Sequence, residues 1–273
     1  MMIVYCLIFI AILLLIYGFS LNYFFKTEEY IIADEKIKKP FRAVFLSDLH
    51  TARFGKKNEK LIEKIRQINP DMVFITGDMV VKNGKRTECV YYLCQTLAKE
   101  YPVYYSPGNH EIRLADYDEF KRKIRSYGVY YLENDSVYLP EQNVVVTGLD
   151  LPEDYYHKCW KKVCFSSEEL AELITYEEPE SFHVLLAHNP EYMPVYGQWG
   201  ANLTLSGHLH GGIAILPGLG GVISPSLRLF PKYDQGYRCE KGCHSIISRG
   251  LGLHHIKLRF FNVPELAVIN FTC

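Results

Sequence analysis

The sequence has almost no net charge. Its 30 lysine and arginine residues are balanced by 31 aspartate and glutamate residues, which gives a formal charge of −1 at pH 7. Proteins that bind nucleic acid by general electrostatic attraction usually carry a clear excess of basic residues. Here the basic residues are scattered among acidic ones, so the composition disfavours a nuclease and predicts no specific nucleic-acid partner.

Cysteine is sparse as well. Eight cysteines in 273 residues are too few for a disulfide-held scaffold, and a chain of this length can bury a sufficient core without one. We therefore expect reduced thiols. Cys239 and Cys243, followed by His244, can form a small metal or redox site, but a single C-x-x-x-C pair is a weak signal.

Charge is absent from the N-terminal segment. Residues 2–25 contain no charged side chain, and at 1.5 Å per residue about 20 helical residues cross the apolar core of a bilayer. A cleaved signal peptide is the competing interpretation. However, no Lys or Arg precedes the apolar run and no clear small-x-small cleavage site follows it. We expect residues 1–26 to be a retained transmembrane anchor of a single-pass membrane protein.

The charges around the anchor predict its orientation. The nearest positive charges all follow it, at Lys26, Lys36, Lys38 and Lys39. Because lysines beside a membrane span favour the cytoplasmic side, we expect the large domain to lie in the cytoplasm. Residues 27–40 are expected to be a linker, and residues 41–273 a single domain.

Within residues 41–273, helix-like and strand-like stretches alternate, which is typical of layered α/β proteins. The predicted strands are residues 42–47, 72–76, 103–105, 129–132, 144–147, 183–186, 203–205 and 266–271. The predicted helices are residues 58–68, 88–99, 116–127 and 167–174.

Five short polar motifs each follow an apolar run that predicts a strand. They are D-L-H at 48–50, G-D at 77–78, G-N-H-E at 108–111, A-H-N at 187–189 and G-H-L-H-G at 207–211. Each one alone has an ordinary explanation, such as a turn aspartate or a structural histidine. Because functional loops of α/β folds gather beyond the carboxyl ends of strands, the whole series predicts one site.

The residue types in these motifs are metal ligands. The candidate ligands are Asp48, His50, Asp78, Asn109, His188, His208 and His210. Asp78 carries two carboxylate oxygens, which suits it to bridging two cations, and the glycines around His208 and His210 let the backbone wrap closely around ions. Imidazole, carboxylate and amide ligands together accept Mn, Fe, Zn or Ni. We expect two divalent metal ions.

The order of the five motifs resembles that of the calcineurin-like metallophosphoesterase superfamily, over residues 41–273. The tail S-R-G-L-G at 248–252, with R-F at 259–260 and N-V-P-E at 262–265, and the N-terminal anchor resemble the bacterial branch of membrane-associated phosphodiesterases. The resemblance implies a metallophosphoesterase catalytic domain with a four-layer α/β/β/α sandwich of two mixed sheets flanked by helices.

The resemblance also implies ligand roles. The first metal would take Asp48, His50 and His210, and the second Asn109, His188 and His208, with Asp78 as the bridge. His110 would remain free to act on the substrate as a catalytic residue, with Glu111 orienting it. Arg249 is a candidate phosphate contact because its planar guanidinium matches phosphate oxygens, although a salt bridge explains it equally well.

These residues predict a metal-dependent phosphoric ester hydrolase in which a metal-bridging hydroxide attacks the phosphorus atom. The resemblance further implies an activity of the phosphodiesterase or pyrophosphohydrolase type on a lipid-linked or UDP-diacylglucosamine-like substrate. A non-catalytic scaffold of the same fold is the main alternative, and a nuclease is the other. Because every ligand position is filled, the scaffold is disfavoured.

Overall fold

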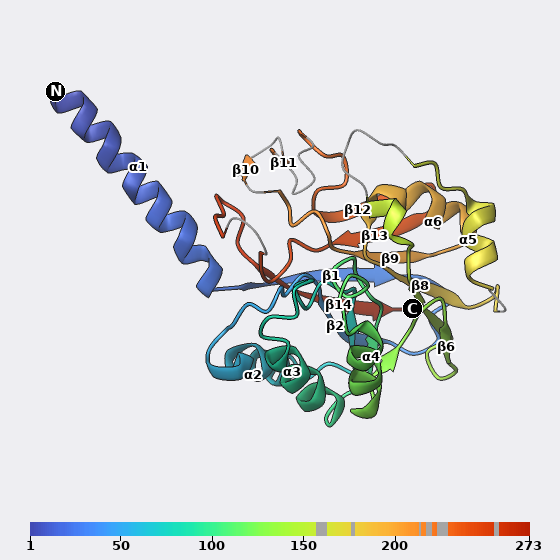
Figure 1. The fold of residues 1–273 in the computed structure, drawn as a ribbon. Coiled ribbons are helices and arrows are strands. Elements are labelled where there is room, and N and C mark those ends of the chain that lie inside the picture. Colours follow the sequence, from blue (N-terminus) through green and yellow to red (C-terminus); the bar gives the residue numbers. More distant parts are fainter. Residues whose placement is uncertain (157–162, 176–177, 213, 217–219, 223–228, 254–256) are drawn as a thin grey trace.

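The computed structural model describes residues 1–156, 163–175, 178–212, 214–216, 220–222, 229–253 and 257–273. Helix α1 (Met2–Ser20), extended by a 3-10 turn η1 (Leu21–Tyr23), projects away from the rest of the chain (Figure 1). It is the one helix in the described residues that is long and apolar enough to cross a membrane. Its side chains are almost all exposed, as expected for a segment without a protein partner along most of its length.

Two six-stranded mixed sheets form the centre of the fold. The first has the order β1 (Lys26–Ala33), β14 (Glu265–Thr272), β2 (Phe41–Leu46), β3 (Met72–Ile75), β4 (Val103–Tyr105), β5 (Tyr130–Tyr131). The second has the order β12 (Gly236–Glu240), β13 (Cys243–Ile247), β9 (Leu203–Ser206), β8 (Phe182–Ala187), β7 (Val144–Leu149), β6 (Ser136–Leu139). A separate pair joins β10 (Ile215–Leu216) and β11 (Gly220–Gly221).

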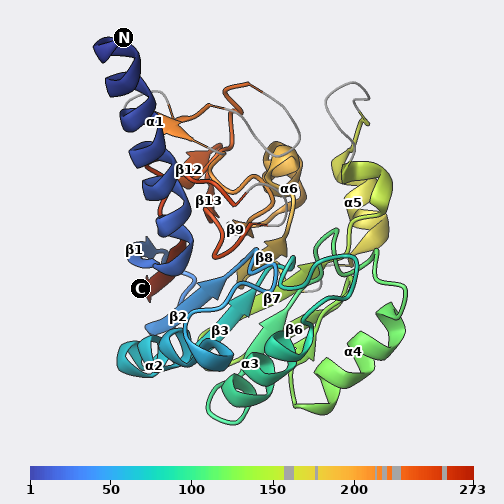
Figure 2. The ribbon, with the colours of Figure 1, turned by 60° about the vertical axis from the view of Figure 1, so that its left-hand side comes forward.

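Helices cover the outer faces of both sheets (Figure 2). Against the first sheet lie α2 (Glu59–Ile68), α3 (Glu88–Ala98) and α4 (Tyr117–Ser126). Against the second lie α5 (Ser167–Leu173) and α6 (Met193–Trp199). Three short 3-10 turns, η2 (Lys56–Asn58), η3 (Glu153–Tyr156) and η4 (Pro190–Tyr192), complete the connections. The order of layers is helix, sheet, sheet, helix, which confirms the four-layer sandwich.

The alternation within β2 shows how the layers are held together. Ala43 and Phe45 point into the apolar core between the two sheets, whereas Val44 and Leu46 point into the core beneath the helices. All four side chains are fully buried. Burying a large apolar side chain contributes about 1.5–3 kcal/mol, so a strand buried on both faces needs the continuous apolar run that the sequence shows.

The expected linker at residues 27–40 is wrong over its first half. Residues Lys26–Ala33 form β1, which pairs in parallel with β14 along its whole length. An edge strand exposes one face to water, so it tolerates charged side chains and gives a weak apolar signal. Ile32 is buried on the inner face while Ile31 is exposed. Strands β6, β12 and β13 were also not predicted, because their exposed or short runs gave the same weak signal.

Candidate metal centre

Parallel strands bring all five motifs to one edge of the sandwich. In the first sheet β2, β3 and β4 are parallel neighbours, and in the second β8 and β9 are. Each motif follows the carboxyl end of its strand, where functional loops collect. Of the seven predicted ligands, six are buried and His208 is partly buried.

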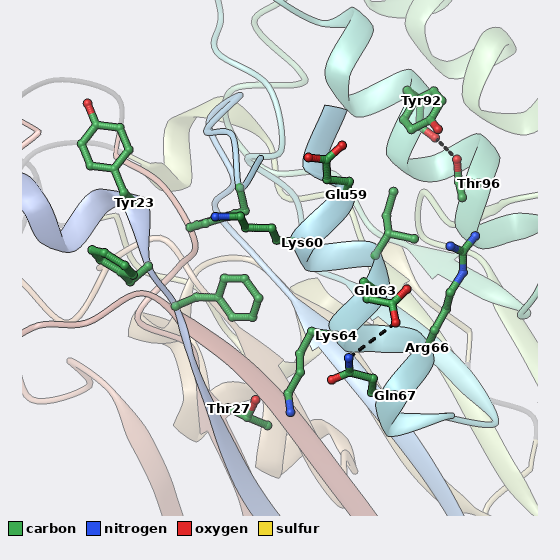
Figure 3. A pocket seen from close by; sticks show the side chains of 14 residues that line it. Tyr23, Thr27, Glu59, Lys60, Glu63, Lys64, Arg66, Gln67, Tyr92 and Thr96 are labelled. Carbon is green, nitrogen blue, oxygen red and sulfur yellow. Dashed lines mark hydrogen bonds between the residues drawn. The ribbon is translucent and has the colours of Figure 1, made fainter. Parts of the chain in front are cut away.

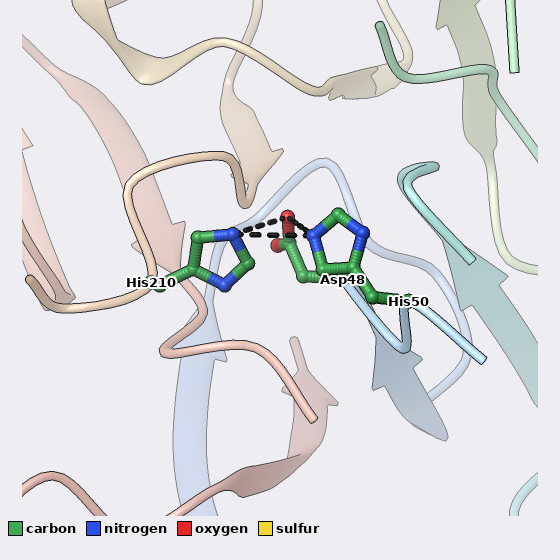
Figure 4. A group of neighbouring side chains, drawn as sticks. All are labelled: Asp48, His50 and His210. Carbon is green, nitrogen blue, oxygen red and sulfur yellow. Dashed lines mark hydrogen bonds and ion pairs between the residues drawn. The ribbon is translucent and has the colours of Figure 1, made fainter. Parts of the chain in front are cut away.

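The first ligand group consists of Asp48, His50 and His210 (Figure 4). The Asp48 Oδ1 atom lies 3.7 Å from His50 Nε2 and 3.6 Å from His210 Nε2. The two Nε2 atoms are 3.2 Å apart. Three ligand atoms from two different sheets therefore converge on one point, as a bound cation requires.

The second group consists of Asp78, His188 and His208, whose ligand atoms lie within 4.8 Å of one another. The Asp78 Oδ2 atom is 3.2 Å from His188 Nε2 and 3.8 Å from His50 Nε2. Asp78 thus lies between the two groups, where a bridging carboxylate has to be. The implied bridging role fits this position.

Asn109 supplies an independent sign that a cation fits here. Its Oδ1 atom is buried and has no hydrogen-bond partner. The residues on both sides of it contact Asp78: a Cβ atom on Gly108 would lie 2.5 Å from Asp78 Oδ1, and the His110 N–H donates to that same oxygen at 2.7 Å. Because buried acceptors are normally satisfied, an orphaned one beside this cluster suits a metal ligand.

Hydrogen bonds at Nδ1 separate ligand histidines from His110. The Nδ1 atoms of His50 and His188 face the carbonyl oxygens of Val80 (3.3 Å) and Thr76 (2.6 Å). A carbonyl only accepts, so Nδ1 carries the proton and Nε2 keeps its lone pair for a cation.

His110 has the opposite arrangement. Its Nδ1 atom accepts from the Lys82 backbone N–H at 3.0 Å, so the neutral ring carries its proton on Nε2. His110 also lies near Asp78 and His50, and distance alone would admit it as a ligand. The tautomer instead presents an N–H group on Nε2, which is a hydrogen-bond donor and not a metal ligand.

Burial and neighbouring charges shift the pKa values of the clustered side chains in opposite directions. Burial raises the pKa of Asp48 to about 7, and the charge of Asp78 adds to the effect. Burial also acts to raise the pKa of Asp78, but His188 and His110 outweigh it and the pKa falls well below its usual value. Burial alone would lower the pKa of His188, yet Asp78 raises it to about 9. Bound cations would satisfy such a cluster by replacing protons.

Sequence comparison agrees with the geometry. The family model described as calcineurin-like phosphoesterase matches residues 41–212, which include all seven candidate ligands. The chain belongs to the calcineurin-like phosphoesterase family. It is therefore a metal-dependent phosphoester hydrolase by family, and the predicted recognition is confirmed.

Individual relatives of this phosphoesterase support the same placement. An uncharacterized metallophosphoesterase from Aquifex aeolicus is 28% identical, with 96% of this chain and 97% of the relative covered. The phosphodiesterase YaeI from Escherichia coli is 25% identical over 84% of this chain and 82% of its own length. The crystal structure of TT1561 from Thermus thermophilus matches with a TM-score of 0.52 and 11% identity, covering 78% of this chain and 91% of that one. This last likeness concerns the fold alone.

Glu111 is a buried anchor of two loops in the phosphoesterase. Its carboxylate accepts hydrogen bonds from the backbone N–H groups of Asp78 (2.7 Å), Met79 (2.8 Å) and Gly108 (3.0 Å), and from the Tyr105 hydroxyl (2.7 Å). The sequence predicted that Glu111 orients the His110 ring. These four bonds instead position the backbone of the G-D and G-N-H-E loops.

The two loops are pressed together and strained. A Cβ atom on Gly77 would lie 2.0 Å from the Gly108 nitrogen, so only glycine fits there. Five of the candidate ligands have left-handed backbone conformations, with φ between 45° and 68°: Asp48, His50, Asp78, His208 and His210. Non-glycine residues rarely adopt this conformation, and such strain concentrates at functional sites.

The C-terminal tail holds the remaining loops in place. The buried Arg259 guanidinium donates to the backbone carbonyls of Arg249 (3.1 Å), Gly250 (3.1 Å) and Gly252 (2.9 Å). The Asn262 amide donates to the carbonyls of His210 (2.7 Å) and, on the same loop, Gly212 (2.6 Å). The sequence marked this tail only through the resemblance, and its bracing role was not predicted.

Arg249 forms the salt bridge that the sequence left open. Its guanidinium forms ion pairs with Glu265 (2.9 Å) and Glu28 (2.6 Å), and β1 supplies one of these carboxylates. The phosphate contact of Arg249 stays a prediction.

Tyr156 and two cysteines complete the comparison with the sequence. Tyr156, which the sequence did not single out, is buried with its ring 5.3 Å from that of His208 and forms a wall of the second ligand group. Cys239 lies opposite His244, and Cys243 opposite Glu240, in the β12–β13 pair. Both thiols are free, and among the described residues neither belongs to a metal-ligand group.

Proposed function

We propose that this chain is a membrane-anchored phosphodiesterase that uses two divalent cations. The observation that carries the proposal is the pair of ligand groups adjoining at Asp78, in which His50 and His188 turn Nδ1 toward carbonyl oxygens and Nε2 toward the ligand groups. Asp48, His50 and His210 would hold one ion, and Asn109, His188 and His208 the other. When bound, such ions activate a water molecule and neutralise phosphoryl oxygens.

The protein's own contribution is positioning and charge stabilisation. His110 holds a proton on Nε2 beside the ligand groups, and in our proposal this N–H donates a hydrogen bond to the phosphoryl oxygens as negative charge develops on them. Burial lowers the pKa of His110, which favours the neutral ring that carries this N–H. The Glu111 carboxylate holds the loops that carry Asp78 and His110 together through their backbone N–H groups.

The proposed location is the membrane, with the domain on the cytoplasmic side. Helix α1 supports the anchor, and the lysines that follow it support the orientation. A non-catalytic scaffold is disfavoured because all ligand positions and His110 are present. A nuclease is disfavoured by the balanced charge.

The test uses the full chain purified in detergent. We expect two metal equivalents by mass spectrometry of the digested protein, and hydrolysis of bis-p-nitrophenyl phosphate with Mn²⁺ that exceeds hydrolysis of p-nitrophenyl phosphate. Loss of activity with a chelator and recovery with metal complete the expected result. Two bound metals without hydrolysis of either compound would indicate a scaffold, and faster cleavage of single-stranded DNA than of the small diester would indicate a nuclease.

A further inference from the structure

The foot of α1 is docked on the catalytic domain rather than tethered by a flexible segment. Gly18 is buried, and its carbonyl accepts from the Arg259 backbone N–H at 3.2 Å. The Asn22 amide donates to the Lys257 carbonyl at 2.8 Å. A Cβ atom on Gly18 would lie 2.7 Å from Leu258 Cδ1, so the contact is tight. The helix therefore holds a defined position on the domain.

This position is at the edge of the first sheet that bears the metal ligands. Strand β1 begins at Lys26, which pairs with Glu265 at the start of β14. Because β14 runs antiparallel to β2, the start of β14 lies beside the end of β2, and Asp48 follows that end. Helix α1 and the first ligand motif thus leave the sheet at the same edge, which would face the membrane that α1 spans in the proposed function.

A cavity of about 340 Å³ lies between the foot of α1 and the first ligand motif. We call it the basic pocket, because Arg53, Arg86 and Lys257 line it together with Asn22, Phe19 and Tyr23. Among the described residues, none of these three cations forms an ion pair with a carboxylate. Uncompensated positive charge in a cavity of this size suits a small anionic group.

The inner wall of the basic pocket is the backbone of the metal centre. Thr51, which lines the pocket, directly follows the ligand His50. Gly252, on the same wall, donates its N–H to the Asp48 carbonyl at 2.6 Å. The wall of the pocket therefore follows the candidate ligand His50 along the chain and is hydrogen-bonded to the backbone of the candidate ligand Asp48.

The outer rim of the pocket consists of aromatic side chains at the end of the apolar helix. Phe19 and Tyr23 are 50% and 71% exposed, and they belong to the last turns of the apolar helix. Exposed aromatic side chains at the end of a membrane span lie at the level of lipid headgroups. The pocket thus opens where phosphate groups of lipids are found, with cations within and apolar surface outside.

We propose that the basic pocket receives the anionic headgroup of a phosphate-bearing amphiphile that remains embedded in the bilayer. This inference rests on the proposed phosphodiesterase activity and names its substrate class. The headgroup would enter from the membrane side, contact Arg53, Arg86 and Lys257, and present its ester to the metal centre. A cavity of about 340 Å³ accommodates a headgroup but not the chains of a lipid, which would stay in the membrane.

A second cavity provides a matched control. It has a volume of about 720 Å³ and lies on the other side of the foot of α1, against α2 (Figure 3). Tyr23 lines both cavities. In the second one Lys60 and Lys64 are accompanied by Glu59 and Glu63, and neither Thr51 nor Gly252, which adjoin the first ligand motif, lines it. Removing these two lysines changes the charge near the membrane without touching the basic pocket.

The experiment measures binding of fluorescent dioleoyl phosphatidic acid in neutral detergent micelles to the full chain, by anisotropy. The double variant Arg53→Ala/Lys257→Ala is compared with Lys60→Ala/Lys64→Ala, which removes the same charge. We expect the dissociation constant to rise about tenfold or more in the first and less than twofold in the second, since each lost charge-assisted phosphate contact is worth about tenfold. Thermal denaturation verifies that both variants are folded, as expected for exposed side chains.

Competing lipids and headgroups identify the occupant. Dioleoylphosphatidylcholine, which lacks net negative charge, and glycerol 3-phosphate, which lacks chains, should each compete at least about tenfold less well than unlabelled phosphatidic acid. Equal weakening in both double variants would overturn the pocket assignment. Glycerol 3-phosphate competing as well as phosphatidic acid would indicate a site for a free phosphate instead.

Hydrolysis of bis-p-nitrophenyl phosphate is measured in parallel and separates the two proposals. Lipid binding that depends on the basic pocket, without hydrolysis, would refute the proposed function and leave the pocket standing. Hydrolysis with equal lipid binding in both double variants would refute the pocket and leave the proposed function standing.

Discussion

The two sheets contribute two halves of the metal centre, and each half is held by a different kind of buried group. At the first sheet, the Glu111 carboxylate collects backbone N–H groups from the G-D and G-N-H-E loops. At the second, the Asn262 amide collects backbone carbonyls from the G-H-L-H-G loop. Beside it, Arg259 collects carbonyls of the tail segment that packs against Asp48.

The two halves differ in how far along the chain the bracing residue lies from the loops that it holds. Glu111 is part of one of the two motifs that it braces and lies 33 residues from Asp78 in the other, so the first half is organised within one stretch of the chain. Asn262 follows His210 by about fifty residues, so the second half forms only when the C-terminal tail is in place. Each buried polar group is costly to leave without its partners, and both halves should therefore be sensitive to single substitutions.

Asp78 belongs to the second ligand group and its Oδ2 atom lies 3.8 Å from His50 Nε2 of the first, so its loss should have the largest effect. We expect Asp78→Asn to release metal from both halves and to lower kcat/KM at least about a thousandfold, because several kcal/mol of charge stabilisation disappears. Metal content and diester hydrolysis are the measurements. Asp118→Asn, at an exposed position on α4, is the control. Retention of two metals would mean that Asp78 does not join the halves.

His110 should separate catalysis from metal binding. We expect His110→Ala to keep both metals while kcat falls by about 10²- to 10³-fold, the usual cost of removing one hydrogen-bond donor that stabilises the transition state. Steady-state kinetics and metal analysis on the same preparation test this. Metal loss as large as that of Asp78→Asn would make His110 a ligand and contradict its tautomer.

Glu111→Gln tests the locally organised half. The substitution removes the charge and turns an N–H donor toward backbone N–H groups, so metal affinity should fall about 10- to 100-fold. The free energy of unfolding should fall by about 1–3 kcal/mol. Chelator titration and urea denaturation measure the two effects. Unchanged values in both would show that Glu111 does not hold the loops.

Asn262→Leu tests the half that depends on the tail. It leaves the carbonyls of His210 and Gly212 without this donor, and we expect about tenfold weaker metal binding. Combined with Glu111→Gln, the effects on unfolding should add within about 0.5 kcal/mol if the halves are independent. A clear departure from additivity would mean that the two halves form one unit.

The smallest expected effect concerns acid stability and is confined to the second sheet. Burial, together with Lys36, lowers the pKa of His183 on β8 to about 3. Below pH about 6.5 the unfolded chain binds a proton that the folded chain does not, so the free energy of unfolding falls by about 1.4 kcal/mol per pH unit. Urea denaturation at pH 6.5 and 5.5 measures this slope. It should flatten in His183→Leu, and an equal slope in that variant would assign the sensitivity elsewhere.

Much of the architecture could be read from local patterns. The apolar runs before Asp48, Asp78, Asn109, His188 and His208 predicted strands, and the structure contains β2, β3, β4, β8 and β9 at those places. Strands buried on both faces give the strongest signal, whereas the edge strand β1 was expected to be linker because half of its side chains face water.

The ligand set followed from the sequence because metal chemistry restricts the residue types and each motif is short. The supports of that set did not follow. Arg249 was expected at a phosphate, but its partners Glu28 and Glu265 are brought to it by the pairing of β1 with β14, more than two hundred residues apart. Arg259, Asn262 and the docking of Gly18 likewise depend on contacts that no local pattern encodes. Local spacing determines which atoms can coordinate an ion, whereas only the packing of distant segments decides what holds those atoms and on which side of the site helix α1 lies.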